Sequence, residues 1–331
     1  MSRVSAIAAL GAAVALAAPA AAFDPWQDEA RYEFTYRVAV DSIQAAPGQT
    51  VSLWFPLAVD SIDQEVSDVR IEAPFTVDEE VDDLGNRMAR LRWTGPAPAG
   101  ATVVVSKRVV RRPSKGMPVE AALATPRDRP DRYLGARKRI PLDGLIEQIA
   151  VQESRDLSTD GEKIRAFYDY VVENMRYAKV GEGWGQGDAI WACTEKYGNC
   201  TDFHSLFLGM ARSQGIPARF VIGFPIAPDE TAAPVGGYHC WAEAWDPERG
   251  WVPFDASEAW KARRFDDYFG TLPSDRIAFT IGRDLVLAPP QQADPLNYFI
   301  YPYAEVDGQP VEKVAADFSF RRLDADTASA R

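Results

Sequence analysis

The sequence predicts an α+β protein in which an antiparallel β-sandwich precedes a core of helices packed on an antiparallel sheet. Alternating apolar and polar segments fill residues 32–110, two amphipathic helical patterns lie between residues 159 and 213, and strand-like segments follow from residue 220. The 331 residues are 47% hydrophobic and 25% charged, which excludes a disordered chain and a disulfide-stapled miniprotein. The length suggests about two domains.

The first 22 residues have the composition of a secretory signal peptide. Arg3 gives a positive start, residues 6–18 are apolar, and three alanines precede the expected cleavage site before Phe23. This apolar run is short for a bilayer span, and no later stretch reaches ~18 apolar residues. We therefore expect an exported protein without a transmembrane segment, most simply in a bacterial periplasm.

Residues 23–112 are expected to form the β-sandwich. Period-2 alternation between turn residues such as Pro47 and Gly48 is typical of antiparallel strands. The predicted strands are 34–40, 50–55, 88–93 and 102–110. We interpret this region as a supporting or spacing module, because a fold alone does not assign a function.

Residues 113–158 are expected to be a linker with a short helix, since proline and charged residues are frequent from about 111 to 141. The basic runs at 108–115 and 132–139 are interpreted as solvated parts of it. The formal net charge of −12 repels phosphate backbones, so we expect no nucleic-acid partner.

Residues 159–264 are expected to form the core. Thr159 and Glu162 match a capping box, and the apolar stripe that follows is predicted to be core packing. A second helix is predicted over about 200–213, with Asn199 as its N-cap. Strands are expected at 220–224, 238–245 and 251–255. Residues 265–331 are expected to be a β-rich extension, with strand-like segments at 277–281, 285–287 and 298–303.

Cys200 stands at the first turn of the second predicted helix. Unpaired amides at a helix N-terminus carry partial positive charge, which lowers the pKa of a thiol and favours the thiolate. A small buried cysteine is the alternative interpretation for this residue taken alone.

His239 and Asp255 are predicted to lie side by side on a hairpin. If Trp245 pairs with Trp251, His239 and Asp255 are diagonal neighbours on one face of the sheet. A carboxylate beside an imidazole fixes its tautomer and stabilises the imidazolium that a thiolate partner requires. The three residues therefore match a Cys-His-Asp arrangement for nucleophilic attack on an acyl group.

Four motifs in this order resemble bacterial transglutaminase-like proteins. They are Tyr197-Gly-Asn-Cys-Thr-Asp-Phe-His204, Gly215-Ile-Pro-Ala-Arg219, Tyr238-His-Cys-Trp-Ala-Glu243 and Gly250-Trp-Val-Pro-Phe-Asp-Ala256. The resemblance covers roughly residues 160–262. It implies a papain-like α+β core with Cys200 as nucleophile, His239 as general base and acid, and Asp255 as the residue that orients the histidine. An N-terminal β-sandwich is common among such relatives, and Gly282-Arg283-Asp284 resembles a later element of some of them.

Other polar residues near these motifs are given secondary roles. His204, one turn after Cys200, is expected to be structural, and Asp202 is expected to complement the helix N-terminus. The Cys200 amide is one candidate oxyanion donor, and the second stays open among Gln186, Trp184 and Tyr177.

Three cysteines allow one disulfide and one free thiol in an oxidising compartment. A Cys193–Cys240 disulfide is one alternative, because alternation turns Cys240 away from His239 and, we expect, off the catalytic face. No cysteine or histidine spacing suggests zinc, and no cofactor or metal is expected.

The sequence therefore predicts an exported thiol enzyme that acts on a carboxamide or peptide bond through an acyl-enzyme, with water favoured as the acceptor. A protein-glutamine acyltransferase that cross-links proteins and a catalytically silent peptide-binding scaffold are the alternatives. The expected partner is a peptide or protein substrate, which includes a cell-envelope peptide. The segment 289–303 is rich in proline and aromatic residues and is a candidate cover for the site.

Overall fold

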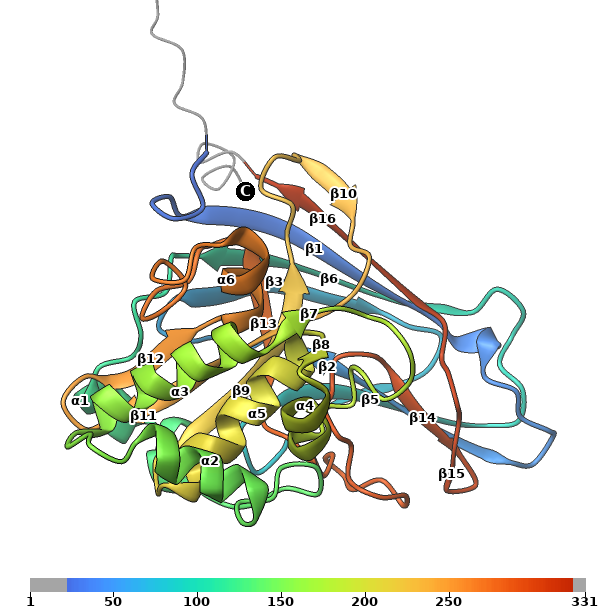
Figure 1. Ribbon diagram of the computed structural model, residues 1–331. Coiled ribbons are helices and arrows are strands. Elements are labelled where there is room, and N and C mark those ends of the chain that lie inside the picture. Colours follow the sequence, from blue (N-terminus) through green and yellow to red (C-terminus); the bar gives the residue numbers. More distant parts are fainter. Residues whose placement is uncertain (1–22, 324–331) are drawn as a thin grey trace, which may run out of the picture.

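A computed structural model describes residues 23–323 of the chain (Figure 1). The expected signal peptide, residues 1–22, lies outside the described residues, and its assignment stays a prediction. Within the described range the protein is a mixed α+β fold with antiparallel sheets, which confirms the predicted fold class. No helix in this range is long and apolar enough to cross a membrane.

Residues 23–323 contain two five-stranded antiparallel sheets that make up the β-sandwich. Sheet 1 has the order β10-β16-β1-β6-β3, and sheet 2 has the order β15-β14-β2-β5-β4. The aromatic ring of Tyr36 in sheet 1 stacks on that of Phe55 in sheet 2, with 6.2 Å between the centroids. The strand bounds are β1 Ala30–Ala39, β2 Thr50–Leu57, β3 Gln64–Glu72, β4 Val77–Val81, β5 Arg87–Thr94, β6 Thr102–Arg111, β10 Ala232–Pro234, β14 Tyr303–Val306, β15 Gln309–Pro310 and β16 Ala316–Arg322.

The sandwich combines segments that the sequence pattern placed in separate regions. Strands β14 and β16, from the expected C-terminal extension, pair with β2 and β1, and β10 extends sheet 1 from within the expected core. Figure 1 shows the red C-terminal strand β16 beside the blue N-terminal strand β1. Local alternation indicates a strand but not its partner, so pairing over more than 250 residues has no sequence signal.

The core sheet has the order β12-β11-β9-β13. It contains β9 Ala218–Pro225, β11 His239–Asp246, β12 Gly250–Phe254 and β13 Arg276–Ile281. Trp245 pairs with Trp251, which confirms the predicted hairpin register. The ring of Phe34 in sheet 1 lies 5.3 Å from that of Phe224 and 5.6 Å from that of Phe279, so aromatic packing joins the sandwich to the core sheet.

Helices cover the core sheet, and α5 (Cys200–Ser213) lies along it in Figure 1. The predicted capping box of Thr159 and Glu162 starts α3 (Asp160–Asn174). Helices α1 (Val119–Ala124) and α2 (Leu145–Glu153) occupy the expected linker, together with the 3-10 turns η2 (Pro126–Asp128) and η3 (Pro130–Tyr133). The remaining elements are η1 (Val40–Ser42), the short parallel pair β7 (Arg176–Tyr177) and β8 (Tyr197–Gly198), α4 (Ala189–Glu195) and α6 (Ala256–Ala262).

Candidate active site

Cys200 is the first residue of α5, as the sequence predicts, and only 3% of it is exposed. The Asn199 side chain caps the helix by accepting a hydrogen bond from the Thr201 amide at 2.8 Å. Burial alone raises the pKa of the Cys200 thiol, whereas hydrogen bonds to Cys240 and His239 and the positive charge of His239 lower it. The net effect is a pKa well below the usual value, which is the property of a reactive thiol.

His239 starts β11 and contacts Asp255 just beyond the end of β12. Its Nε2 lies 2.6 Å from Asp255 Oδ2, and both side chains are buried. Burial lowers the pKa of His239, but the charge and hydrogen bond of Asp255, with a contribution from Cys200, raise it to about 10. Because Asp255 occupies Nε2, the Nδ1 atom is the nitrogen left for the hydrogen bond with Cys200.

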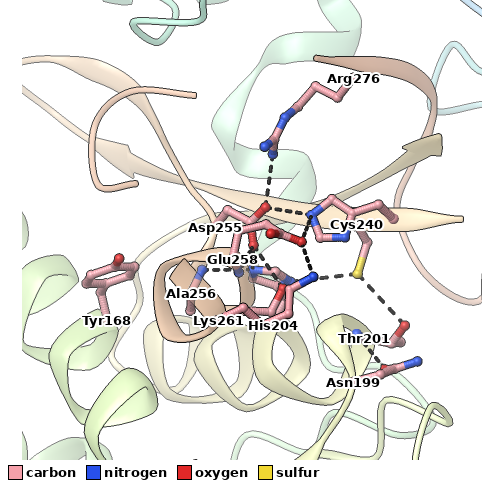
Figure 2. Close-up of polar contacts among 12 residues, drawn as sticks. Tyr168, Asn199, Thr201, His204, Cys240, Asp255, Ala256, Glu258, Lys261 and Arg276 are labelled. Carbon is pink, nitrogen blue, oxygen red and sulfur yellow. Dashed lines mark hydrogen bonds and ion pairs between the residues drawn. The ribbon is translucent and has the colours of Figure 1, made fainter. Parts of the chain in front are cut away.

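The two carboxylate oxygens of Asp255 have different partners. Oδ1 accepts hydrogen bonds from Ser257 Oγ at 2.9 Å and from the Glu258 amide at 3.0 Å, which caps α6. Oδ2 faces His239 and also accepts a hydrogen bond of 3.0 Å from an Arg276 guanidinium nitrogen (Figure 2). Burial raises the pKa of Asp255, but the charges of His239 and Arg276 hold it well below its usual range.

Arg276 is a site residue that the sequence analysis missed. Its side chain is 3% exposed and stacks over the Trp241 ring at 5.3 Å. It stands at the start of β13, in the region expected to be a separate C-terminal extension. No local motif marks it, because its role depends on β13 pairing with β9.

His204 occupies a structural position in the fully buried layer behind the site. Its Nε2 accepts a hydrogen bond from the Ala256 amide at 3.2 Å, and its Nδ1 lies 3.7 Å from Cys240 Sγ (Figure 2). Burial lowers the pKa of His204, which favours the neutral imidazole. The neutral ring joins α5 to the first turn of α6.

Cys240 lies beside Cys200, and the expectation that it points off the catalytic face is wrong. Its sulfur is 3.8 Å from Thr201 Oγ1, and burial together with the interaction with Cys200 raises the pKa of Cys240 well above its usual value. Alternation along β11 does turn Cys240 away from His239, but it turns it toward α5, which carries Cys200. All three cysteines are free thiols, so the Cys193–Cys240 disulfide is not formed.

Asp202 has a larger role than the sequence indicates. Its carboxylate accepts hydrogen bonds from the backbone amides of Gly185 at 2.6 Å, Gly187 at 2.9 Å and Asn199 at 2.9 Å. A Cβ on Gly187 would lie 2.6 Å from the Thr201 side chain, so only glycine fits this approach. The glycine-rich loop at 181–187 is thereby fixed to the N-terminus of α5.

The three candidate oxyanion donors lie in different surroundings. Tyr177 is half-buried. Burial is the largest cause that raises its pKa, and the charge of Cys200 is the second largest, which indicates that the ring lies in the neighbourhood of the sulfur. Trp184 lies 5.8 Å from the Lys179 ammonium. Gln186 is exposed, and its backbone carbonyl accepts a hydrogen bond from Asn297 at 2.8 Å. The second oxyanion donor stays open among the three.

Tyr238 is a second neighbour of Cys200 that the sequence analysis did not select. Its hydroxyl lies 3.0 Å from Asn199 Nδ2 and 2.9 Å from Thr201 Oγ1. The rings of Tyr298 and Tyr301 pack against it at centroid distances of 5.3 and 5.9 Å. The segment 289–303 therefore covers this side of the site, which was one possibility that the sequence left open.

An open cavity of about 350 Å³ adjoins His239 on the other side. Its polar lining is His239, Glu258, Asp275 and Arg276. Prolines and larger apolar side chains form the rest of the wall: Pro225, Ile226, Pro228, Pro234, Val235, Tyr268 and Phe320. A substrate group in this cavity would contact the imidazole directly.

Comparison with known proteins identifies the region around this site. The family model described as the Transglutaminase-like superfamily matches residues 147–256, which include Cys200, His239 and Asp255. These residues form a transglutaminase-like domain. An uncharacterized protein of Haemophilus influenzae is 27% identical over 355 residues, with 94% of this chain and 95% of that protein covered. The uncharacterized protein YebA of Bacillus subtilis is 27% identical over 145 residues, which are 39% of this chain and 19% of YebA.

A solved structure shares the overall fold. The crystal structure of a protein from Cytophaga hutchinsonii, named as a candidate cysteine protease, matches with a TM-score of 0.60 and 18% identity. The match covers 91% of this chain and 93% of that one, so it includes the sandwich as well as the transglutaminase-like domain. The fold and the domain together support a thiol-enzyme-like function.

Proposed function

We propose that this protein is a thiol hydrolase that cleaves a carboxamide or peptide bond through an acyl-enzyme. Cys200 is the nucleophile, His239 the general base and acid, and Asp255 the residue that orients the imidazole. The contact that carries the proposal is the buried hydrogen bond of 2.6 Å between His239 Nε2 and Asp255 Oδ2. His239 is on β11, the strand next to the helix α5 that carries Cys200. This bond favours an imidazolium beside a thiolate.

In the proposed reaction the Cys200 thiolate attacks the substrate carbonyl, and a C–S bond forms. The imidazolium of His239 delivers its proton to the leaving nitrogen as the C–N bond breaks. His239 then takes a proton from water, whose oxygen attacks the thioester, and the acid product leaves with the thiolate restored. The Cys200 amide is one proposed donor to the oxyanion, and the second stays open among Tyr177, Trp184 and Gln186.

Turnover of defined substrates tests this proposal. Purified protein is incubated with casein peptides and, separately, with peptidoglycan fragments, and the products are identified by mass spectrometry. The proposal predicts cleavage of one class by the wild type and none by Cys200→Ala or His239→Ala, while Cys193→Ala keeps activity. Equal cleavage by Cys200→Ala would refute it, and substrate binding without turnover in the wild type would favour the silent scaffold.

Acyl transfer to an amine is the second candidate, and the cavity beside His239 favours it. Water needs no second binding site, whereas an amine acceptor does, and Glu258 and Asp275 place carboxylates in that cavity. Incorporation of a fluorescent primary amine into casein, measured beside release of free acid, separates transfer from hydrolysis.

We also propose that the protein is exported to the periplasm, on the basis of the signal-peptide pattern at residues 1–22. The expected substrate is therefore a cell-envelope or other extracytoplasmic peptide. N-terminal sequencing of the protein from a periplasmic fraction should begin at Phe23.

A further inference from the structure

The outer face of sheet 2 carries a second cavity, of about 460 Å³, that the proposed reaction does not use. Strands β2 and β5 form its floor, where Trp54 pairs with Arg90 and Ser52 pairs with Arg92. Arg90 and Arg92 are two residues apart on β5, so their side chains leave the same face of the sheet. Thr50, Gln292, Glu305 and Asp307 complete the polar lining.

Arg90 and Arg92 have no carboxylate partner within 4.0 Å in the described part of the chain. Asp78, which is opposite Arg90 on β4, forms no ion pair with it. Arg90 Nε is also buried without a hydrogen-bond acceptor among residues 23–323.

The two carboxylates in the cavity wall already have other donors. Glu305 is 2% exposed and accepts from the Gln292 and Ala293 amides at 2.9 Å and from the Tyr303 hydroxyl at 2.8 Å. Asp307 accepts from the Thr50 amide at 2.8 Å and from Gln49 at 3.1 Å. These acidic groups are therefore committed to backbone and side-chain contacts, and the arginines keep their donors free.

Trp54 positions one of the two arginines. Its side chain is 2% exposed, and its indole N–H is buried out of reach of a ligand in the cavity. The Arg90 guanidinium lies 5.6 Å from the Trp54 ring, and this cation–π contact holds Arg90 against the cavity wall.

We propose that this cavity binds an oxyanion group, a carboxylate or a phosphate, through the guanidinium groups of Arg90 and Arg92. A ligand rich in acceptors pairs with both, and a planar guanidinium matches the geometry of such groups. The site lies on the sandwich and would give this module a binding role in addition to its supporting one. The proposal does not depend on the chemistry at Cys200.

Calorimetric titration of the full chain at low ionic strength tests the proposal. The probes are inorganic phosphate and a tetraglutamate peptide with blocked termini. Arg90→Gln and Arg92→Gln should each weaken binding by about tenfold, because a charged hydrogen bond is lost. Arg87→Gln is the matched control, since Arg87 is on the same strand but faces the other way and pairs with Glu79.

The pattern of binding distinguishes the sources of the anion. Saturable binding of phosphate alone supports a free-anion site, and binding of the peptide supports a site for an acidic chain. If the wild type binds neither probe, or if Arg90→Gln and Arg92→Gln bind as the wild type does, the proposal is overturned. Unchanged alkylation of Cys200 in both variants shows that they are folded.

Discussion

Replacing Asp255 by Asn should remove the charge that keeps His239 protonated and leave the helix cap in place. Asn accepts hydrogen bonds at an N-cap as Asp does, so α6 should persist. The rise in the pKa of His239 from 6.5 to about 10 corresponds to about 5 kcal/mol in favour of the imidazolium. At pH 8 about 99% of His239 is then imidazolium, whereas in Asp255→Asn the ring should be mostly neutral, because burial opposes the charge and only the contribution of Cys200 still favours it.

Imidazole NMR with ¹⁵N-labelled histidine measures this change directly, because the chain has only two histidines. In the wild type one ring should titrate near pH 10 and the other, His204, should stay neutral at pH 7. In Asp255→Asn both rings should be neutral at pH 8, and a His204→Gln variant assigns the signals. A His239 ring that titrates near pH 6.5 in the wild type, or titrates unchanged in Asp255→Asn, would refute this account of the site.

Substitutions at three further positions test other parts of the structure. Lys107, buried in the core with no hydrogen-bond acceptor in the described range, has a pKa lowered by burial to about 7. Below pH 7 the buried ammonium therefore lowers the free energy of unfolding by up to about 5 kcal/mol, and this penalty fades as the pH rises toward 10.5. Lys107→Met should thus resist urea better than the wild type at pH 7. An equal advantage at pH 10 would contradict this explanation. Asp202→Ala leaves three amides without an acceptor and should lower the free energy of unfolding by about 2–4 kcal/mol. The loop at 181–187 should also be cleaved faster by proteases. Unchanged proteolysis of this loop would argue against the anchoring role of Asp202. Arg276→Gln should lower the free energy of unfolding in urea by about 3–5 kcal/mol, because Asp255 loses a buried charge partner. Arg276→Lys keeps the charge and should lose less stability. An equal loss of stability in both variants would indicate that Arg276 acts through packing and not through its charge.

Local patterns in the sequence were enough for the elements that carry Cys200 and His239. Thr159 and Asn199 mark helix starts by capping chemistry that acts within three residues. The Trp245–Trp251 register follows from a short turn, and it places His239 diagonally across from Asp255. These contacts span few residues, which is why the sequence predicts them.

Contacts between distant segments had no such signal. Arg276 reaches Asp255 only because β13 pairs with β9, and the sandwich closes only because β16 pairs with β1. The neighbourhood of Cys240 and Cys200 depends on which face of β11 the helix α5 covers, and alternation alone does not determine that face. The bonds of Asp202 to Gly185 and Gly187 depend on the path of the intervening loop and α4.

Reactivity of Cys200 toward iodoacetamide tests the central claim most directly. The native protein is treated at pH 6 and at pH 8, and modified cysteines are located by mass spectrometry, with the urea-denatured protein as reference. The account predicts selective modification of Cys200 at both pH values, with Cys193 and Cys240 protected, because only Cys200 has a pKa well below the usual value. Modification of Cys200 no faster than in the denatured chain, or with the pH dependence of an ordinary thiol, would contradict it.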